Sequence, residues 1–150
     1  MRLNTRTGFS LPEVIVIIAL VLLVGGMSIE AFSSLSKHEA LSANTIVLAT
    51  RLRDARAQTL ASVGGAQYGV RIATTTLTFF RGASYDPSSA TNDVFQLSSY
   101  VRASSSAESF VFERLTGNSS ASGTIEMYLA SDFGQKKTVT VQSSGLVNIQ

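Results

Sequence analysis

The chain has 150 residues, enough for one domain of ordinary size, and 45% of them are hydrophobic. It carries 12 basic and 10 acidic residues, and two of the basic ones, Arg2 and Arg6, precede Gly8. Without residues 1–8 the side-chain balance is 10 minus 10, or zero, which argues against a nucleic-acid-binding protein. The lack of cysteine excludes a disulfide framework and a thiolate metal site.

The first segment is an apolar run that contains one acid. Residues 14–29 carry no charge, and a helix of that length covers about 24 Å, less than the ~30 Å hydrocarbon core of a bilayer. A helix from Phe9 to Ile29 covers about 31 Å and would span it, but this stretch includes Glu13. Ser10 and Glu13 fit a capping box, and Pro12 suits a first turn, so a helix is predicted to begin here. Because an unpaired buried carboxylate costs several kcal/mol, Glu13 needs a partner.

Three interpretations fit this segment, and in all of them Arg2 and Arg6 favour a cytoplasmic N-terminus. The first is a secretory signal peptide cleaved after the apolar run, which the early acid disfavours. The second is a plain signal anchor in which Glu13 only caps the helix. The third is a processing site at the front of the run, with Gly8 as the last leader residue and Phe9 as the new N-terminus.

The helix is predicted to continue through residues 31–62, which contain no glycine and no proline. Its apolar and small residues recur at spacings of four and three, which predicts one buried face. That face consists of Leu41, Thr45, Leu48, Leu52, Ala55 and Thr59. The charged residues Arg51, Arg53, Asp54 and Arg56 lie mostly off this face. They are interpreted as a solvated flank rather than a phosphate-binding patch. Gly64 and Gly65 are predicted to end the helix with a left-handed cap.

Beyond Gly65 the hydrophobic period changes to two, which predicts short strands separated by Gly, Ser, Asn and Asp turns. The segments are 68–73, 77–80, 94–97, 100–103, 109–115, 124–130, 138–142 and 145–150. No helical pattern interrupts them, so the sheets should be antiparallel, with one face on the long helix. The predicted fold is therefore α+β, and the longest loop is expected over residues 82–93.

The stretch GFSLPEVIVIIALVL resembles the cleavage and methylation segment of type IV pilins and type II secretion pseudopilins, which is G-F-[ST]-L-x-E followed by an apolar helix. The residues that match in order and spacing are Gly8, Phe9, Ser10, Leu11 and Glu13. The resemblance implies that a prepilin peptidase cuts after Gly8 and that the new amine of Phe9 is methylated. It also implies that Glu13 faces the N-terminal amine of an adjacent subunit, which would give the buried carboxylate its partner.

The second half resembles the β-rich C-terminal region of GspH/FimT-like minor pseudopilins and minor pilins. The residues that carry this likeness are Phe112, Leu115, Gly117, Gly123, Ile125 and Gly145. The two resemblances divide the chain into a leader (1–8), a transmembrane and filament-core helix (9–30), an amphipathic half of the same helix (31–63) and a β-rich head (66–150). They imply a single-pass protein of the cytoplasmic membrane with an extracytoplasmic head, which later enters a filament.

The expected function is structural: a minor subunit that joins or caps a type II secretion pseudopilus or a type IV pilus-like filament. Its expected partners are the prepilin peptidase, other pilin-like subunits, the inner-membrane assembly platform and, before assembly, membrane lipid. No catalytic motif is found, His38 is the only histidine, and no cofactor or metal is expected. The alternative is a DNA-binding minor pilin of an uptake pilus, but only Lys136 and Lys137 lie near the uncharged C-terminus.

Overall fold

The computed structural model describes residues 9–150, and within them it leaves the side chains of residues 24–31 undescribed. The predicted leader, including Gly8 of the predicted cleavage site, lies outside the described residues, and the predicted span 9–30 is described only in part. The chain divides into two units, residues 1–36 and residues 37–150. We call the second unit the head.

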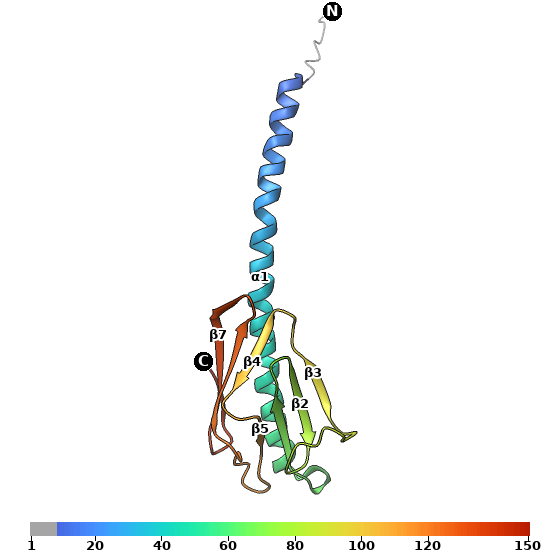
Figure 1. Ribbon diagram of the computed structural model, residues 1–150, viewed down its shortest axis with the longest axis vertical. Helices are drawn as coiled ribbons and strands as arrows, with labels where there is room; N and C mark the ends of the chain where they lie inside the picture. The colour runs from blue at the N-terminus through green and yellow to red at the C-terminus, as the bar shows by residue number, and fades with distance from the viewer. Residues whose placement is uncertain (1–8) are drawn as a thin grey trace, which may run out of the picture. The chain divides into compact units, whose positions relative to one another are not determined.

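One helix, α1, runs over 50 residues from Leu11 to Leu60 (Figure 1). It begins where the capping-box pattern predicts, since the backbone N–H groups of Glu13 and Val14 donate to the Ser10 carbonyl at 3.0 and 3.3 Å. Pro12 stands at the second helical position, where its missing N–H costs nothing. Within the part of the chain whose placement is described, no helix is both long and apolar enough to cross a membrane.

The head contains two four-stranded sheets in which every neighbouring pair of strands is antiparallel, as predicted. The first sheet has the order β3-β2-β1-β5 and the second has the order β4-β6-β7-β8. The strands are β1 (Tyr68–Ile72), β2 (Thr76–Arg81), β3 (Asp93–Gln96), β4 (Val101–Ser105), β5 (Ser109–Val111), β6 (Gly123–Leu129), β7 (Asp132–Val141) and β8 (Val147–Ile149). The predicted long loop corresponds to the connection between β2 and β3.

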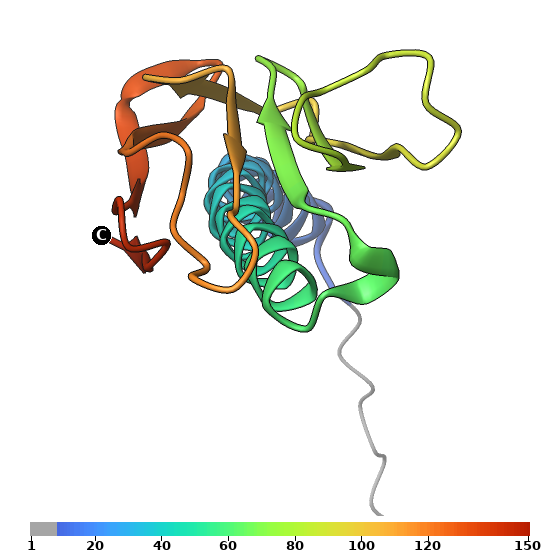
Figure 2. The same cartoon turned by 90° about the horizontal axis from the view of Figure 1, so that it is seen from below.

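The part of α1 that belongs to the head forms the centre of the core. All six residues of the predicted face are buried, with exposed fractions of 3% or less. The four apolar ones, which exclude Thr45 and Thr59, pack in one cluster with inward side chains of both sheets, among them Val70, Phe110, Ile125 and Val139. Figure 2 looks along this helix and shows the strands curving around it on two sides. The fold is therefore α+β, with an N-terminal helix packed on antiparallel sheets, as the sequence predicts.

Left-handed backbone conformations after the end of α1 redirect the chain toward β1. Ser62, Gly64 and Gly65 have φ values of 50°, 58° and 64°, so the left-handed stretch begins at a serine two residues before the predicted glycines. The Thr59 hydroxyl donates to the Ala55 carbonyl at 2.8 Å and accepts the Tyr68 N–H at 2.9 Å. This one side chain therefore connects the last turn of the helix to the first strand.

The two strands that differ most in length from their predictions are β5 and β7. β5 ends at Val111 instead of residue 115, because the chain enters a tight turn in which Leu115 and Gly117 have φ values of 71° and 67°. β7 begins at Asp132, six residues before the predicted start at Thr138. Residues 132–136 are exposed on both faces, so no hydrophobic alternation marks this end of the strand.

Candidate functional site

The predicted assembly residues lie at the start of α1. Phe9 precedes the helix and its side chain is 76% exposed. The Ser10 N–H donates to Oε2 of Glu13 at 3.4 Å, longer than the 2.7–3.2 Å of an ordinary N–H···O bond. The carboxylate half of the predicted capping box is thus present but weak. Glu13 is exposed and keeps acceptor capacity for another group.

Large apolar side chains surround the helix immediately after Glu13. Between residues 14 and 23 their exposed fractions range from 43% to 70%. They are Val14, Ile15, Val16, Ile17, Ile18, Leu20, Val21, Leu22 and Leu23. A helix that is apolar on every side is stable only inside a bilayer or among other helices. This surface therefore needs a partner that the single chain does not supply within its described residues.

Three arginines of the predicted solvated flank, none of them buried, also make contacts across the head. Arg51 pairs with Asp93 at the start of β3. Arg53 donates to the Val147 carbonyl of β8 at 3.0 Å, and Arg56 donates from Nε to the Gly117 carbonyl at 3.0 Å. These side chains therefore fasten β3, β8 and the turn after β5 to the helix. Sequence analysis missed this role because backbone carbonyl acceptors leave no signature in residue type.

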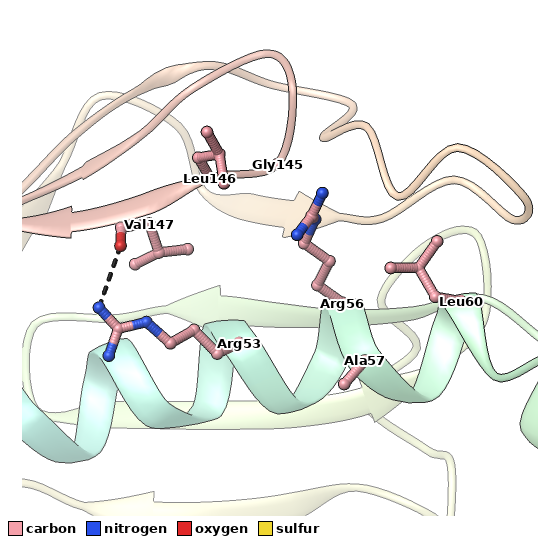
Figure 3. A pocket seen from close by; sticks show the side chains of 7 residues that line it. All are labelled: Arg53, Arg56, Ala57, Leu60, Gly145, Leu146 and Val147. Carbon is pink, nitrogen blue, oxygen red and sulfur yellow. Dashed lines mark hydrogen bonds between the residues drawn. The ribbon is translucent and has the colours of Figure 1, made fainter.

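A groove of about 270 Å³ lies between α1 and the turn that joins β7 to β8 (Figure 3). Its lining residues are Arg53, Arg56, Ala57, Leu60, Gly145, Leu146 and Val147. None of these is an acid, a histidine or a hydroxyl residue, so the groove offers no group for acid–base or nucleophilic chemistry. Its two guanidinium groups already donate to the backbone, at Val147 for Arg53 and at Gly117 and Ser144 for Arg56.

The two lysines that the DNA-binding alternative would use also have partners in the head. Lys136 Nζ lies 2.7 Å from Oε1 of Glu126, and Lys137 Nζ lies 2.9 Å from the Ser42 hydroxyl of α1. His38 is exposed, and in the described part of the chain no three His, Cys, Asp or Glu side chains are grouped to hold a metal.

Among the described residues, the two groups with a clearly shifted pKa are Arg71, which lies in β1, and Asp86, which lies in the loop between β2 and β3. A hydrogen bond from Arg71 to Glu108 raises the pKa of Arg71, whose guanidinium also lies 4.7 Å from the ring centre of Tyr85. The hydroxyl and backbone N–H of Ser88 both donate to Asp86 and lower its pKa. These contacts order the loop, and they do not form a catalytic pair.

The chain thus combines an N-terminal helix, whose second part lies in the core of the head, with two antiparallel sheets. Solved structures agree at the level of the fold. The minor pseudopilin EpsH of the type 2 secretion system of Vibrio cholerae aligns with 17% identity and a TM-score of 0.57, over 73% of this chain and 94% of EpsH.

Crystal structures of the type IV minor pilin FimU of Pseudomonas aeruginosa align equally well. One has 10% identity and a TM-score of 0.59, over 73% of this chain and 87% of FimU. A second crystal form has 13% identity and a TM-score of 0.55, over 77% and 90%. No protein-family model and no curated protein matches the sequence. The chain therefore shares its fold with a minor pseudopilin and a minor pilin.

Proposed function

We propose that this chain is a minor pilin-like structural subunit that enters, or caps, a type II secretion pseudopilus or a type IV pilus-like filament. The observation that carries this proposal is the exposed apolar surface of α1 between residues 14 and 23. In the head, one face of the same helix is buried in the core. The apolar side chains between residues 14 and 23 are exposed instead and need partners. Packing against the helices of other subunits would cover that surface.

The proposed maturation concerns the residues just before this surface. A prepilin peptidase cuts between Gly8 and Phe9, and the amine of Phe9 is methylated. Glu13 then pairs with the N-terminal amine of a neighbouring subunit. The weak 3.4 Å contact with Ser10 supports this role, because it leaves the carboxylate free to exchange local capping for an ammonium partner.

The proposed role involves no catalysis and no nucleic acid. Arg51, Arg53 and Arg56 are used to hold the head together, and Lys136 and Lys137 contact Glu126 and Ser42. A protein that binds phosphates mainly through counterion release needs several available cations on one face. These pairings favour a structural subunit over the DNA-uptake alternative.

The proposal is tested in the native host with an epitope-tagged full chain. Filaments or pseudopili are sheared from the cells, and the tagged chain is sought among the co-purifying pilin-like subunits by mass spectrometry. We expect the chain to co-purify in less than the amount of the major subunit. Recovery in the membrane fraction alone, while the other subunits assemble normally, would contradict the proposal.

A further inference from the structure

One end of the head carries aromatic rings that are exposed and lie outside the hydrophobic core. Tyr100 is 49% exposed and Phe133, at the tip of the β6–β7 hairpin, is 72% exposed. The ring of Phe133 lies 5.3 Å from that of Tyr128, at an interplanar angle of 32°. We call Tyr100, Tyr128 and Phe133 the aromatic rim.

The register of the second sheet explains why these rings face outward. Tyr128 pairs with Arg102 on β4 and with Lys136 on β7, so the ring stands in a row between two cations. The alternate residues Met127 and Leu129 are buried in the core, which leaves this row on the outer face. The hydrogen bond from the Ala130 N–H to the Tyr100 carbonyl, 2.8 Å long, brings Tyr100 to the same hairpin.

The rim lies at the end of the head where α1 enters. The 2.9 Å contact between Lys137 and Ser42 places β7 beside the first turns of the helix within the head. The β6–β7 hairpin continues from there to its tip, at the end of the head that includes Lys37 (Figure 1). The groove at Leu60 and Leu146 belongs to the other end of the head, near the end of α1.

The length of the connecting chain limits how far this end can stand from a membrane. The uncharged apolar run ends at Ile29 and the head begins at Lys37. Seven residues separate them, which as a helix measure roughly 11 Å. The polar interfacial zone on each side of a bilayer is roughly 5–8 Å thick. The connection therefore keeps this end of the head within a few ångströms of a zone in which aromatic side chains are enriched.

Charged residues favour contact between this end of the head and a membrane less than the aromatic rings do. The charged residues at this end are Lys37, Glu39, Arg102, Glu126, Asp132, Lys136 and Lys137. Four are basic and three are acidic, so they sum to +1, and Lys136 is already paired with Glu126. This balance permits contact with an anionic headgroup layer but does not drive it.

We propose that the aromatic rim inserts into the interfacial zone of the phospholipid bilayer while the subunit awaits assembly. This inference rests on the proposed function, because a filament subunit that awaits assembly is expected to be anchored in the membrane by its N-terminal helix. The rim then holds the head against the membrane surface, and extraction of the subunit into a filament breaks this contact.

The test uses the absence of tryptophan from the chain. Phe133→Trp places the chain's single indole in the rim, and Leu115→Trp places it at an 86% exposed control position near the far end of α1. Each full-length variant is reconstituted into vesicles of phosphatidylcholine and phosphatidylglycerol that contain a lipid with a quencher near the headgroup. Vesicle flotation establishes in the same samples whether the chain is anchored.

We expect a blue-shifted emission and a several-fold larger loss of fluorescence for Phe133→Trp than for Leu115→Trp. If the chain floats with the vesicles but both variants are quenched equally, or the indole at position 133 is not quenched, the rim does not contact lipid and this inference alone fails. If neither variant floats, the membrane anchoring in the proposed function fails, and this inference fails with it.

Discussion

The Nε atom of Arg56 donates a hydrogen bond of 3.0 Å to the carbonyl of Gly117, sixty-one residues further along the chain. The same guanidinium donates through Nη2 to the Ser144 carbonyl at 3.3 Å. One side chain of α1 thus holds two turns, the one after β5 and the one between β7 and β8. Gly117 and Gly145, with φ values of 67° and 76°, allow both turns to approach it closely.

Gly145→Ala should destabilise the head by about 1–3 kcal/mol, because the substitution combines backbone strain with a steric clash. A Cβ at this position would lie 2.0 Å from the Gly117 carbonyl oxygen and 2.7 Å from Nε of Arg56. Gly65→Ala is the matched control, since its φ is 64° but nothing lies within 4 Å of an added Cβ. Thermal unfolding of the full chain in detergent measures the stability of both variants. Equal losses of stability would mean that the clash with Gly117 and Arg56 does not destabilise the head beyond the backbone strain.

Gly8→Leu should block removal of the leader, because a peptidase that cuts between Gly8 and Phe9 needs a small residue before the cut. Gly8→Ala should be milder. Mass spectrometry of the protein from its native host measures the outcome as loss of residues 1–8, with or without one added methyl group on Phe9. An intact leader on the unmutated chain within filaments would refute the processing site.

Glu13→Val should leave membrane insertion and leader cleavage intact but prevent incorporation into the filament. Removing one member of a buried charge pair costs roughly 3–5 kcal/mol, and here the loss would fall on the contact with a neighbouring subunit. Co-purification with the other subunits measures the effect. Normal recovery of the complex, with full secretion or piliation, would mean that Glu13 serves only as the cap contacted by the Ser10 N–H.

Duplex DNA should bind the full chain in detergent no more tightly than about 10⁻⁶ M at physiological salt, the range of non-specific binding. The reason is that Arg51, Arg53, Arg56, Lys136 and Lys137 already have partners in the head. Gel-shift titration at several salt concentrations tests this. Tighter binding that Lys136→Gln and Lys137→Gln abolish would support the uptake alternative instead.

Asp86 should titrate below the ordinary aspartate range, since two donors of Ser88 stabilise its carboxylate at 2.7 and 2.9 Å. A carboxyl group whose folded pKa is lowered stabilises the fold above its unfolded pKa, and this contribution is lost as the pH falls through the folded value. Ser88→Ala should raise the midpoint in a carboxyl NMR titration. Ser89→Ala, which leaves both donors in place, should not, and equal midpoints in all three proteins would refute the assignment.

Periodicity predicted the parts of the fold that depend on burial. Leu41, Leu48 and Leu52 recur at helical spacing, and the structure buries each of them against both sheets. The order of strands in the sheets was not predicted, because many pairings of short alternating strands bury the same residues. The turn at Leu115 was missed for another reason: this residue has a positive φ of 71° and is 86% exposed, where leucine gives no turn signal.

The candidate sites also include residues that the sequence predicted and residues that it did not. The Gly8–Phe9 junction and Glu13 were predicted from a linear motif, and their assignment remains a prediction. The anchoring roles of Arg53 and Arg56 were not foreseeable, because their acceptors are carbonyl oxygens 94 and 61 residues away. Only the closed fold brings those atoms within reach.

The bond between Arg53 and Val147 has a consequence for when the protein folds. It joins one of the first segments of the head to leave the ribosome to the last strand, and Val147 itself belongs to the central hydrophobic cluster. The side of the newly made helix that β7 and β8 cover therefore stays open until almost the whole chain has been synthesised, although β1 and β2 become available earlier. A factor that shields the open side of the helix during that interval should raise the yield of folded protein, because transiently exposed apolar surface promotes aggregation.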